Sequence, residues 1–448
     1  MGDPHSMKQA VIRVLGCKVN QAEAAAMAAI LEDRGYRVDP SPSDPNLILV
    51  HTCCVTAKAE GKSRRAVKRL AEAYPHARML ITGCLAEVNP LSVQEISDRI
   101  TVLGTFEKDR LAELLDVDGH AGGQLHHRGS SACTSFADLG CAGIPGRGRA
   151  FLKVQDGCSQ GCAYCIVPTA RGPSRSLPLE RAVAHGRSLA EKGFAEIVLT
   201  GIHLGWYGRD LQPSVGPADL LERLLRECPS VRFRLSSLEP QDISPRLISL
   251  VTQHERVCRH FHVPLQSGDD GILKRMRRPY DMALIHRLLE SIYEADPDTC
   301  VGFDVMVAFP GESDRSFRTT ESFVREARAA YLHVFPFSPR PGTAAASFHP
   351  SVPDGIATSR VEALRGLSAD LRSRFARRFI GRVLTVVPEE APGPEAQFVK
   401  GRTDNYIPVK LRVPCEFRAK RFFDVLLERL EEGEVTGSVV VKPNATKD

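Results

Sequence analysis

The sequence lacks any long hydrophobic run. None of its apolar stretches approaches the roughly 20 residues that a membrane-spanning helix needs, which excludes a helical membrane protein. Its first residues, MGDPHSMKQ, contain no apolar core and so do not have the composition of a secretory signal. From these two absences we expect a cytoplasmic protein with no membrane partner.

The chain also lacks a strong excess of charge of either sign. It carries 59 Lys and Arg residues against 54 Asp and Glu residues, which leaves a net charge of only +5. Basic residues are instead concentrated in local runs, which can hold phosphates, although each run alone is also typical of a solvated helix face. The runs contain Lys62, Arg64, Arg65, Lys68 and Arg69; Lys274, Arg275, Arg277 and Arg278; and Arg372, Arg374, Arg377, Arg378 and Arg382.

Nothing in the sequence indicates secretion, so its 13 cysteines are not expected to form a disulfide framework. In a reducing compartment, clustered cysteines are more often metal ligands. The 448 residues are 43% hydrophobic and 25% charged, which is ordinary for a globular protein of about two to four domains.

The first region, residues 8–118, alternates short apolar runs with helical patterns, which predicts a parallel α/β domain. Each predicted strand ends beside a cysteine: Cys17, then Cys53 with Cys54, then Cys84. Ligands gather at the carboxyl ends of strands in such sheets, so these cysteines can converge on one point. The strand candidates are 11–16, 47–52 and 78–83, and the helix candidates are 23–36 and 59–74.

Residues 119–149 are rich in Gly and Ser without periodicity, which predicts a linker or a mobile surface loop. His126, His127, Cys133 and Cys141 can in principle bind a metal. In a segment of this composition, an unstructured connection is the favoured interpretation.

The central region, residues 150–378, contains six strand candidates separated by helical patterns. Six successive βα units with right-handed crossovers predict an open, partial TIM-like (βα)6 barrel, whose site lies at the carboxyl ends of its strands. A long Arg-rich helix over about 356–380 closes this region. The strand candidates are 151–156, 195–200, 231–236, 259–265, 300–309 and 332–337.

The last region, residues 379–445, contains short β-rich runs such as GRVLTVVPEE, NYIPVKLRV and TGSVVVKP. These runs predict a small antiparallel β-barrel.

Three cysteines in the stretch VQDGCSQGCAYCIVP, Cys158, Cys162 and Cys165, have the spacing C-x₃-C-x₂-C and no fourth Cys or His nearby. A structural zinc site closes its tetrahedron with four ligands. A cubane iron–sulfur cluster held by three thiolates leaves one iron open to a substrate or cofactor. The missing fourth ligand therefore favours a catalytic iron–sulfur site over a structural zinc site.

C-x₃-C-x-aromatic-C after the first strand of a βα barrel resembles the signature of the radical S-adenosylmethionine (SAM) enzymes. The resemblance implies that Cys158, Cys162 and Cys165 hold a 4Fe-4S cluster whose open iron chelates SAM. It further implies cleavage of SAM to a 5′-deoxyadenosyl radical, with Tyr164 packed near the adenine. The same resemblance places other SAM contacts at Thr200, Gly201, Ser236, Glu239 and Gln266.

The segments LGCKVNQAE, HTCCVTAKAE and ITGCLAE resemble the cysteine motifs of the methylthiotransferases within that family. The resemblance implies a second 4Fe-4S cluster held by Cys17, Cys53 and Cys84, which carries the sulfur that is methylated and transferred. Cys54 is then a small buried hydrophobe.

Three departures from the family pattern concern positions near these sites. His51 stands where Asn is usual, Ile202-His203 where Val-Asn is common, and Ala308 where Gly is common. A change beside a cluster can tune it without removing it.

The tail, FIGRVLTVV with GRTDNYIPVKL, resembles a TRAM domain, a small β-barrel that usually binds RNA. The resemblance implies RNA contacts at Arg402, Asn405 and Tyr406, with Lys400 and Lys410 as further phosphate contacts and Tyr406 stacked on a base. The alternative for Tyr406 is an ordinary strand residue.

Segments such as ARGPSRSLPLE, LSSLEP and LHVFPFSPRPGT resemble the branch that methylthiolates N6-threonylcarbamoyladenosine at position 37 of tRNA. The implied partners are the tRNA anticodon loop and an electron donor such as flavodoxin or ferredoxin. Two branches share the machinery, one acting on isopentenyladenosine-37 of tRNA and one on an aspartate of a ribosomal protein. A non-enzymatic alternative is an RNA-binding protein stabilised by zinc.

Overall fold

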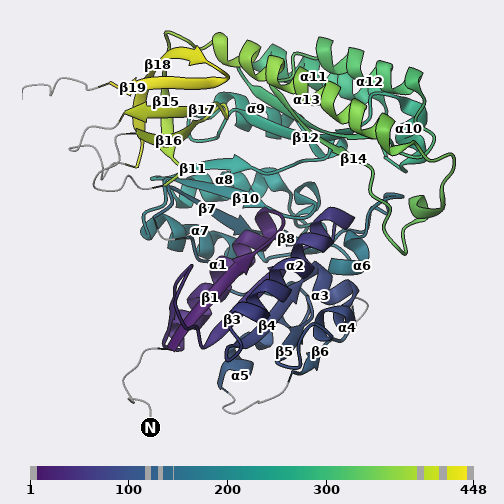
Figure 1. Cartoon of the computed structure of the whole chain (residues 1–448). Helices are drawn as coiled ribbons and strands as arrows, with labels where there is room; N and C mark the ends of the chain where they lie inside the picture. The colour runs from purple at the N-terminus through teal and green to yellow at the C-terminus, as the bar shows by residue number, and fades with distance from the viewer. Residues whose placement is uncertain are drawn as a thin grey trace, which may run out of the picture.

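The chain forms three regions that follow one another in sequence and in space (Figure 1). An N-terminal α/β unit lies against a central array of parallel strands and helices, and a small β-barrel packs on the opposite side of that array. The computed structural model describes residues 8–116, 123–129, 135–144, 146–390, 398–412 and 421–440.

The N-terminal region is a six-stranded parallel sheet with the order β2-β1-β3-β4-β5-β6. Every residue of the run LILVHT is buried, as expected for a parallel strand that is covered on both faces. The strands are β1 (Lys8–Val14), β2 (Tyr36–Val38), β3 (Leu47–Thr52), β4 (Arg78–Gly83), β5 (Ile100–Leu103) and β6 (Leu125–His126). The helices are α1 (Lys18–Asp33), α2 (Ala57–Ala73), α3 (Cys84–Val88), α4 (Pro90–Gln94) and α5 (Leu111–Asp116), with a 3₁₀ turn η1 (Lys108–Arg110).

The described part of the segment predicted as a linker contains a strand and several side-chain contacts. Part of it forms β6, which adds an edge strand to the sheet because its backbone pairs with β5. Further along, Asp138 accepts hydrogen bonds from Arg181 and contacts His185. Within the described residues His127 contacts Glu87, whereas Cys141 lies at the carbonyl of His185, so the two do not share a metal site. Cys133 lies outside the described residues.

The central region contains the six predicted parallel strands, arranged as two three-stranded sheets. Single parallel bridges, Phe233 to Val257 and Ser237 to His262, join the sheets into one open barrel. The strands are β7 (Arg149–Lys153), β10 (Glu196–Thr200), β11 (Arg232–Leu235), β12 (His260–Gln266), β13 (Cys300–Val307) and β14 (Tyr331–Pro336). A short hairpin, β8 (Gln155–Asp156) with β9 (Arg175–Ser176), follows β7. The helices are α6 (Val167–Arg171), α7 (Leu179–Glu191), α8 (Pro217–Glu227), α9 (Pro245–Gln253), α10 (Asp270–Arg275), α11 (Met282–Ala295), α12 (Asp314–Glu326) and α13 (Asp354–Arg377).

The C-terminal region is a closed five-stranded barrel with the order β15-β16-β17-β19-β18. A small barrel was predicted from the tail pattern, and it is present, although only three of its strands were recognisable. The prediction of a wholly antiparallel barrel was wrong, because β17 and β19 pair in parallel. The strands are β15 (Val383–Pro388), β16 (Phe398–Thr403), β17 (Pro408–Arg412), β18 (Phe423–Glu431) and β19 (Glu434–Val439). In the described part of the chain, helices combining the length and apolarity needed to cross a bilayer are absent.

Candidate functional site

The trio Cys158, Cys162 and Cys165 lies in the loop between β8 and α6, at the carboxyl end of the barrel strands. Each thiol is half-buried. Burial raises the pKa of Cys158 to about 11 and that of Cys165 to about 12, and the charges of the neighbouring thiols add to both shifts. A metal binds the thiolate form, so a metal shared by the three thiols would offset this cost of ionisation.

Two side chains that the sequence analysis did not assign to a site contact this trio directly. The guanidinium of Arg278 lies 3.0 Å from the sulfur of Cys162, and it forms an ion pair with the carboxylate of Glu239. Nδ1 of His203 lies 3.5 Å from the sulfur of Cys158, while its Nε2 lies 2.8 Å from Asp242. The departure at His203 therefore falls against a candidate cluster ligand.

The predicted SAM contacts lie at the carboxyl ends of successive strands. Thr200 ends β10 and Gln266 ends β12, while Ser236 directly follows β11. Among the described residues, the hydroxyl of Ser236 and the side-chain oxygen of Gln266 are buried without a hydrogen-bond partner. Unpaired buried polar atoms are costly, so their presence at the carboxyl ends of the barrel strands fits a polar cofactor such as SAM.

The other three predicted SAM contacts also lie near the trio. Tyr164 packs edge-to-face on Phe309, with ring centres 6.3 Å apart, and its hydroxyl lies 3.5 Å from Arg278. Gly201 leaves room for Gln155, because a Cβ there would lie 2.8 Å from the Gln155 side-chain oxygen. Glu239 is engaged by Arg278, as described above.

The second trio is assembled from three separate strand ends. In the register of β3 and β4, Thr52 is paired with Gly83, and Cys53 and Cys84 are the next residues on the two strands' carboxyl sides. Cys17 follows the end of β1, which pairs with β3. Burial raises the pKa of Cys53 to about 12, and the charges of Cys84 and Cys17 contribute to that shift. The three thiols therefore lie close together, as their positions after the predicted strands implied.

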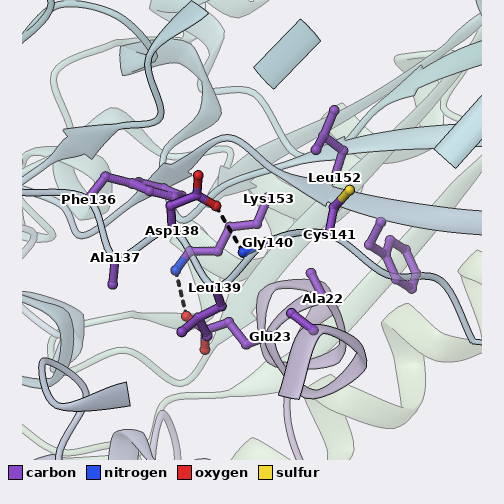
Figure 2. Close-up of a pocket in the computed structure, with 12 residues that line it drawn as sticks. Ala22, Glu23, Phe136, Ala137, Asp138, Leu139, Gly140, Cys141, Leu152 and Lys153 are labelled. Carbon is purple, nitrogen blue, oxygen red and sulfur yellow. Dashed lines mark hydrogen bonds and ion pairs between the residues drawn. The ribbon is translucent and has the colours of Figure 1, made fainter. Parts of the chain in front are cut away.

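A buried cluster of charges joins the two trios. The guanidinium of Arg171, on α6, lies 2.9 Å from Asp156 and 2.7 Å from the side-chain oxygen of Asn20 on α1. Burial raises the pKa of Cys84, whereas the charge of Arg171 opposes that rise. The ammonium of Lys153 lies 2.6 Å from Glu23, beneath residues 136–141 (Figure 2). The cluster consists of Glu23, Lys108, Lys153, Asp156 and Arg171.

His51 is part of the same buried environment. Its Nε2 lies 2.8 Å from Glu23, and burial lowers the pKa of His51 to about 4 despite that contact. A neutral imidazole must then donate from Nε2, because a carboxylate can only accept. Cys54 is fully buried in the hydrophobic core beside α2, as expected of a small hydrophobe.

Arg402, Asn405 and Tyr406, the predicted RNA contacts, lie where the C-terminal barrel meets the amino-terminal ends of the central strands. The ring of Tyr406 stacks on His260 with centres 4.1 Å apart, and Asn405 is fully buried. Arg402 lies 2.8 Å from Glu389 and above the Tyr406 ring. The stacking of Tyr406 on His260 joins the two barrels, so a base stacked on Tyr406 would have to replace His260. The Arg402 contacts lie within the C-terminal region, and among the described residues the buried side-chain nitrogen of Asn405 has no hydrogen-bond partner.

The basic runs have different outcomes. In the second run Arg278 is buried and Arg275 donates to the carbonyl of Pro310, whereas Lys274 and Arg277 are exposed. On α2, Lys62, Arg65 and Arg69 are exposed.

The residues that the sequence analysis missed are the charged partners of the cysteines, above all Arg171 and Arg278. Both lie inside segments that had been noted for other reasons, ARGPSRSLPLE and KRMRR. The sequence shows only that each is a basic residue without a nearby acidic residue in the chain, and this does not indicate whether the side chain is buried.

Comparison with known proteins agrees with this geometry. A family profile described as "Uncharacterized protein family UPF0004" matches residues 9–104, and one described as "Radical SAM superfamily" matches residues 152–324. The threonylcarbamoyladenosine tRNA methylthiotransferase MtaB of Bacillus subtilis (strain 168) is 33% identical over 407 residues, covering 90% of each chain. The enzyme of that name from Rickettsia prowazekii is 33% identical over 410 residues, covering 91% of this chain and 92% of its own.

Among solved structures, the fold is similar to the radical S-adenosylmethionine methyltransferase TsrM from Kitasatospora setae. The TM-score is 0.53 at 16% identity, over 76% of this chain and 77% of that chain. This likeness concerns the fold alone. The chain-long identity to the curated enzymes carries the assignment further: the chain belongs to the radical SAM methylthiotransferase family, and within it to the MtaB branch.

Proposed function

We propose that this enzyme converts N6-threonylcarbamoyladenosine at position 37 of tRNA to its 2-methylthio derivative. The observation that carries the proposal is the similarity to MtaB enzymes over about nine-tenths of the chain, with both cysteine trios inside the matched length. The MtaB name of these relatives includes threonylcarbamoyladenosine and tRNA.

The proposed cofactors are two 4Fe-4S clusters and SAM. Cys158, Cys162 and Cys165 would hold one cluster, and Cys17, Cys53 and Cys84 the other. When bound, these groups supply a carbon-centred radical at the barrel site and the sulfur at the second site. The buried charges of Arg278 and Arg171 favour the thiolate forms of the neighbouring cysteines, because each guanidinium lowers the pKa of a thiol that burial raises.

The proposed tRNA surface includes α2, which begins four residues after Cys53. Its exposed basic side chains recur every three or four residues and so share one helix face, as a phosphate-binding surface requires. They are Lys58, Lys62, Arg65 and Arg69. The RNA contacts at Arg402, Asn405 and Tyr406 stay a prediction, and the inter-barrel position of these residues gives them less support.

The electron donor is proposed to be a flavodoxin or a ferredoxin, since cleavage of SAM consumes an electron. The test is reduction of the loaded enzyme by either protein, followed by measurement of 5′-deoxyadenosine. If dithionite reduced the enzyme but neither protein led to 5′-deoxyadenosine, the assignment of the donor would be rejected. The assignment of the tRNA substrate would not be affected.

The decisive experiment for the substrate is mass spectrometry of tRNA nucleosides from a strain that lacks this gene. Loss of the methylthio form of threonylcarbamoyladenosine is expected, with restoration by the wild-type gene. Loss only of the methylthio form of isopentenyladenosine, or of the modified ribosomal aspartate, would contradict the proposal.

The zinc-stabilised alternative is tested on the purified protein. Anaerobic reconstitution should give about eight irons per chain and a reduced spectrum that SAM perturbs. A colourless protein with bound zinc and no response to reductant would support the alternative.

A further inference from the structure

The inner face of the central barrel is polar, whereas its outer face is apolar. On β12, β13 and β14, alternate residues such as Val263, Phe303 and Leu332 belong to the hydrophobic core shared with the surrounding helices. Because successive side chains of a strand point to opposite faces, the intervening residues line the interior. A polar lining is unusual for a barrel of this size, whose interior is ordinarily filled by branched apolar side chains.

Three of these interior residues form a connected group. Nε2 of His262 lies 2.9 Å from Oδ1 of Asp304, and Nδ1 of His333 lies 3.3 Å from the same oxygen. Nδ1 of His262 is in turn 2.9 Å from the hydroxyl of Tyr331. Asp304 and His262 thus contact each other directly, while half of the His333 side chain is exposed and can contact a ligand.

Lys18 reaches this interior from the N-terminal region. It is the first residue of α1, the helix that packs against β7 of the central barrel, and it directly follows Cys17. Burial lowers the pKa of Lys18, the nearby charges of Arg234 and Arg149 lower it further, and the charge of Asp304 opposes them. Lys18 is also one of the charges that, after burial itself, lower the pKa of His260. The charged groups near Lys18 therefore lie on strands of the central barrel. Arg149, Arg234, His260 and Asp304 lie on β7, β11, β12 and β13.

Among the described residues, the side chain of Lys18 has neither a hydrogen bond nor an ion pair, which distinguishes it from the other cations of the interior. Lys153 is paired with Glu23 and Asp156, and Arg234 is paired with Glu196. A half-buried ammonium without an acid is unfavourable by itself and offers its charge to an anionic ligand.

We propose that Lys18 and His333 recognise the acidic substituent of the target adenosine. Lys18 binds its carboxylate, and His333 forms a hydrogen bond with its hydroxyl or urea group. The inference rests on the proposed function, and it names the residues that select the substrate. A threonylcarbamoyl group carries a carboxylate, a hydroxyl and a urea, all of which this lining can pair. An isopentenyl group can pair none of them and would leave the ammonium and the imidazole desolvated. The barrel interior thus favours the first substituent over the second.

The test uses anticodon stem-loops that carry threonylcarbamoyladenosine at position 37, and matched stem-loops in which the threonyl carboxylate is a carboxamide. Binding is measured by fluorescence anisotropy, and KM and kcat by product formation with reconstituted enzyme. The variants are Lys18→Met, Lys18→Arg and His333→Ala, and the matched control is Lys192→Met, an exposed lysine on the outer side of the barrel. Iron is counted in each sample, because Lys18 adjoins Cys17.

For the wild type, the carboxamide should bind about 10- to 100-fold more weakly than the carboxylate, the range expected for one charge-assisted hydrogen bond. Lys18→Met should show the same loss on the carboxylate and no further loss on the carboxamide, while Lys18→Arg keeps most of the affinity. His333→Ala should weaken binding of both stem-loops by about 3- to 10-fold. Lys192→Met should bind both like the wild type.

Equal affinity of the wild type for the two stem-loops, or a Lys18→Met variant that still discriminates between them, would overturn the inference while leaving the proposed function intact. If the wild-type enzyme did not methylthiolate the carboxylate stem-loop at all, the proposed function would fail first. If the protein bound one divalent ion per chain and His333→Ala abolished that binding, His262, Asp304 and His333 would be assigned to a metal site. That result would also overturn the inference.

Discussion

The two cysteine trios reach similar chemistry by opposite routes. Cys158, Cys162 and Cys165 lie within eight residues of one loop, whereas Cys17, Cys53 and Cys84 are spread over 68 positions and meet only because three strands are parallel and adjacent. The positions of the first three cysteines depend mostly on the conformation of one loop, whereas those of the second three depend mostly on how separate strands are arranged. The second should therefore be the more sensitive to changes elsewhere in the fold.

The largest expected difference between the trios is functional. Cys158→Ala should abolish cleavage of SAM, whereas Cys53→Ala should leave cleavage measurable and stop sulfur insertion, because each removes one ligand from a different site. Each variant should lose about four of about eight irons. The readouts are 5′-deoxyadenosine, methylthio product and iron content. A Cys53→Ala enzyme that made product at the wild-type rate would disprove the assignment of the second trio.

The next effect concerns the buried charges that connect the trios. Arg171→Met should destabilise the protein by about 3–5 kcal/mol, since it leaves Glu23 and Asp156 short of a buried partner. Arg181→Met is the matched control, because Arg181 is an exposed arginine whose ion pair contributes about 1 kcal/mol or less. Urea unfolding measures both. Equal losses for the two variants would show that the buried cluster does not hold the regions together.

Two glycines sharpen the comparison of local and tertiary geometry. Gly83 precedes Cys84 with φ +96°, and a Cβ there would lie 2.4 Å from the carbonyl oxygen of Thr52. Gly161 precedes Cys162 with φ +73° and has nothing within 4 Å of the same position. Gly83→Ala should therefore cost about 3 kcal/mol or more, because strand β3 must move. Gly161→Ala should cost about 1 kcal/mol of backbone strain.

The measurement for the glycine pair is urea unfolding together with iron content. Gly83→Ala should lose iron from the second trio selectively, so that SAM cleavage persists. Similar stability for the two variants would contradict the distinction between the trios.

The smallest effect concerns the segment that covers the contact between the two regions. The hydrogen bond that His185 donates to Asp138 raises the pKa of His185 from 6.5 to about 9, and Cys141 adds to the shift. A pKa raised in the folded state gives a stabilisation that is fully present below about pH 6.5 and is lost as the pH rises through about 9. Since the pair is partly exposed, we expect a loss of about 1–2 kcal/mol over that range.

The free energy of unfolding at pH 6 and pH 9.5 measures this effect, with His185→Gln as the comparison. The part of the pH dependence that is due to this pair should disappear in His185→Gln. An unchanged slope in that variant would assign the pH dependence to other groups.

Much of the architecture could be predicted from local patterns. LILVHT and RMLITG form β3 and β4 with the predicted bounds, and all six predicted barrel strands are present, because buried parallel strands are continuous apolar runs. Short strands such as β2 and β6 were missed, since two or three residues carry no periodicity. The sequence left Tyr406 as a residue stacked on a base or as an ordinary strand residue, whereas its stacking on His260 depends on how the two barrels dock.

The sequence by itself determined the types of element, the six candidate cluster ligands and the family, because these depend on spacing, periodicity and motif. The tertiary structure decided which charges meet. Arg171 reaches the second trio from α6, which follows the first trio, and Lys18 lies beside the central barrel although its helix belongs to the N-terminal region. The physical reason is that burial and ion pairing depend on residues that are distant in the sequence and meet only in the fold. The sequence does not distinguish a charged side chain that faces water from one that faces another buried charge.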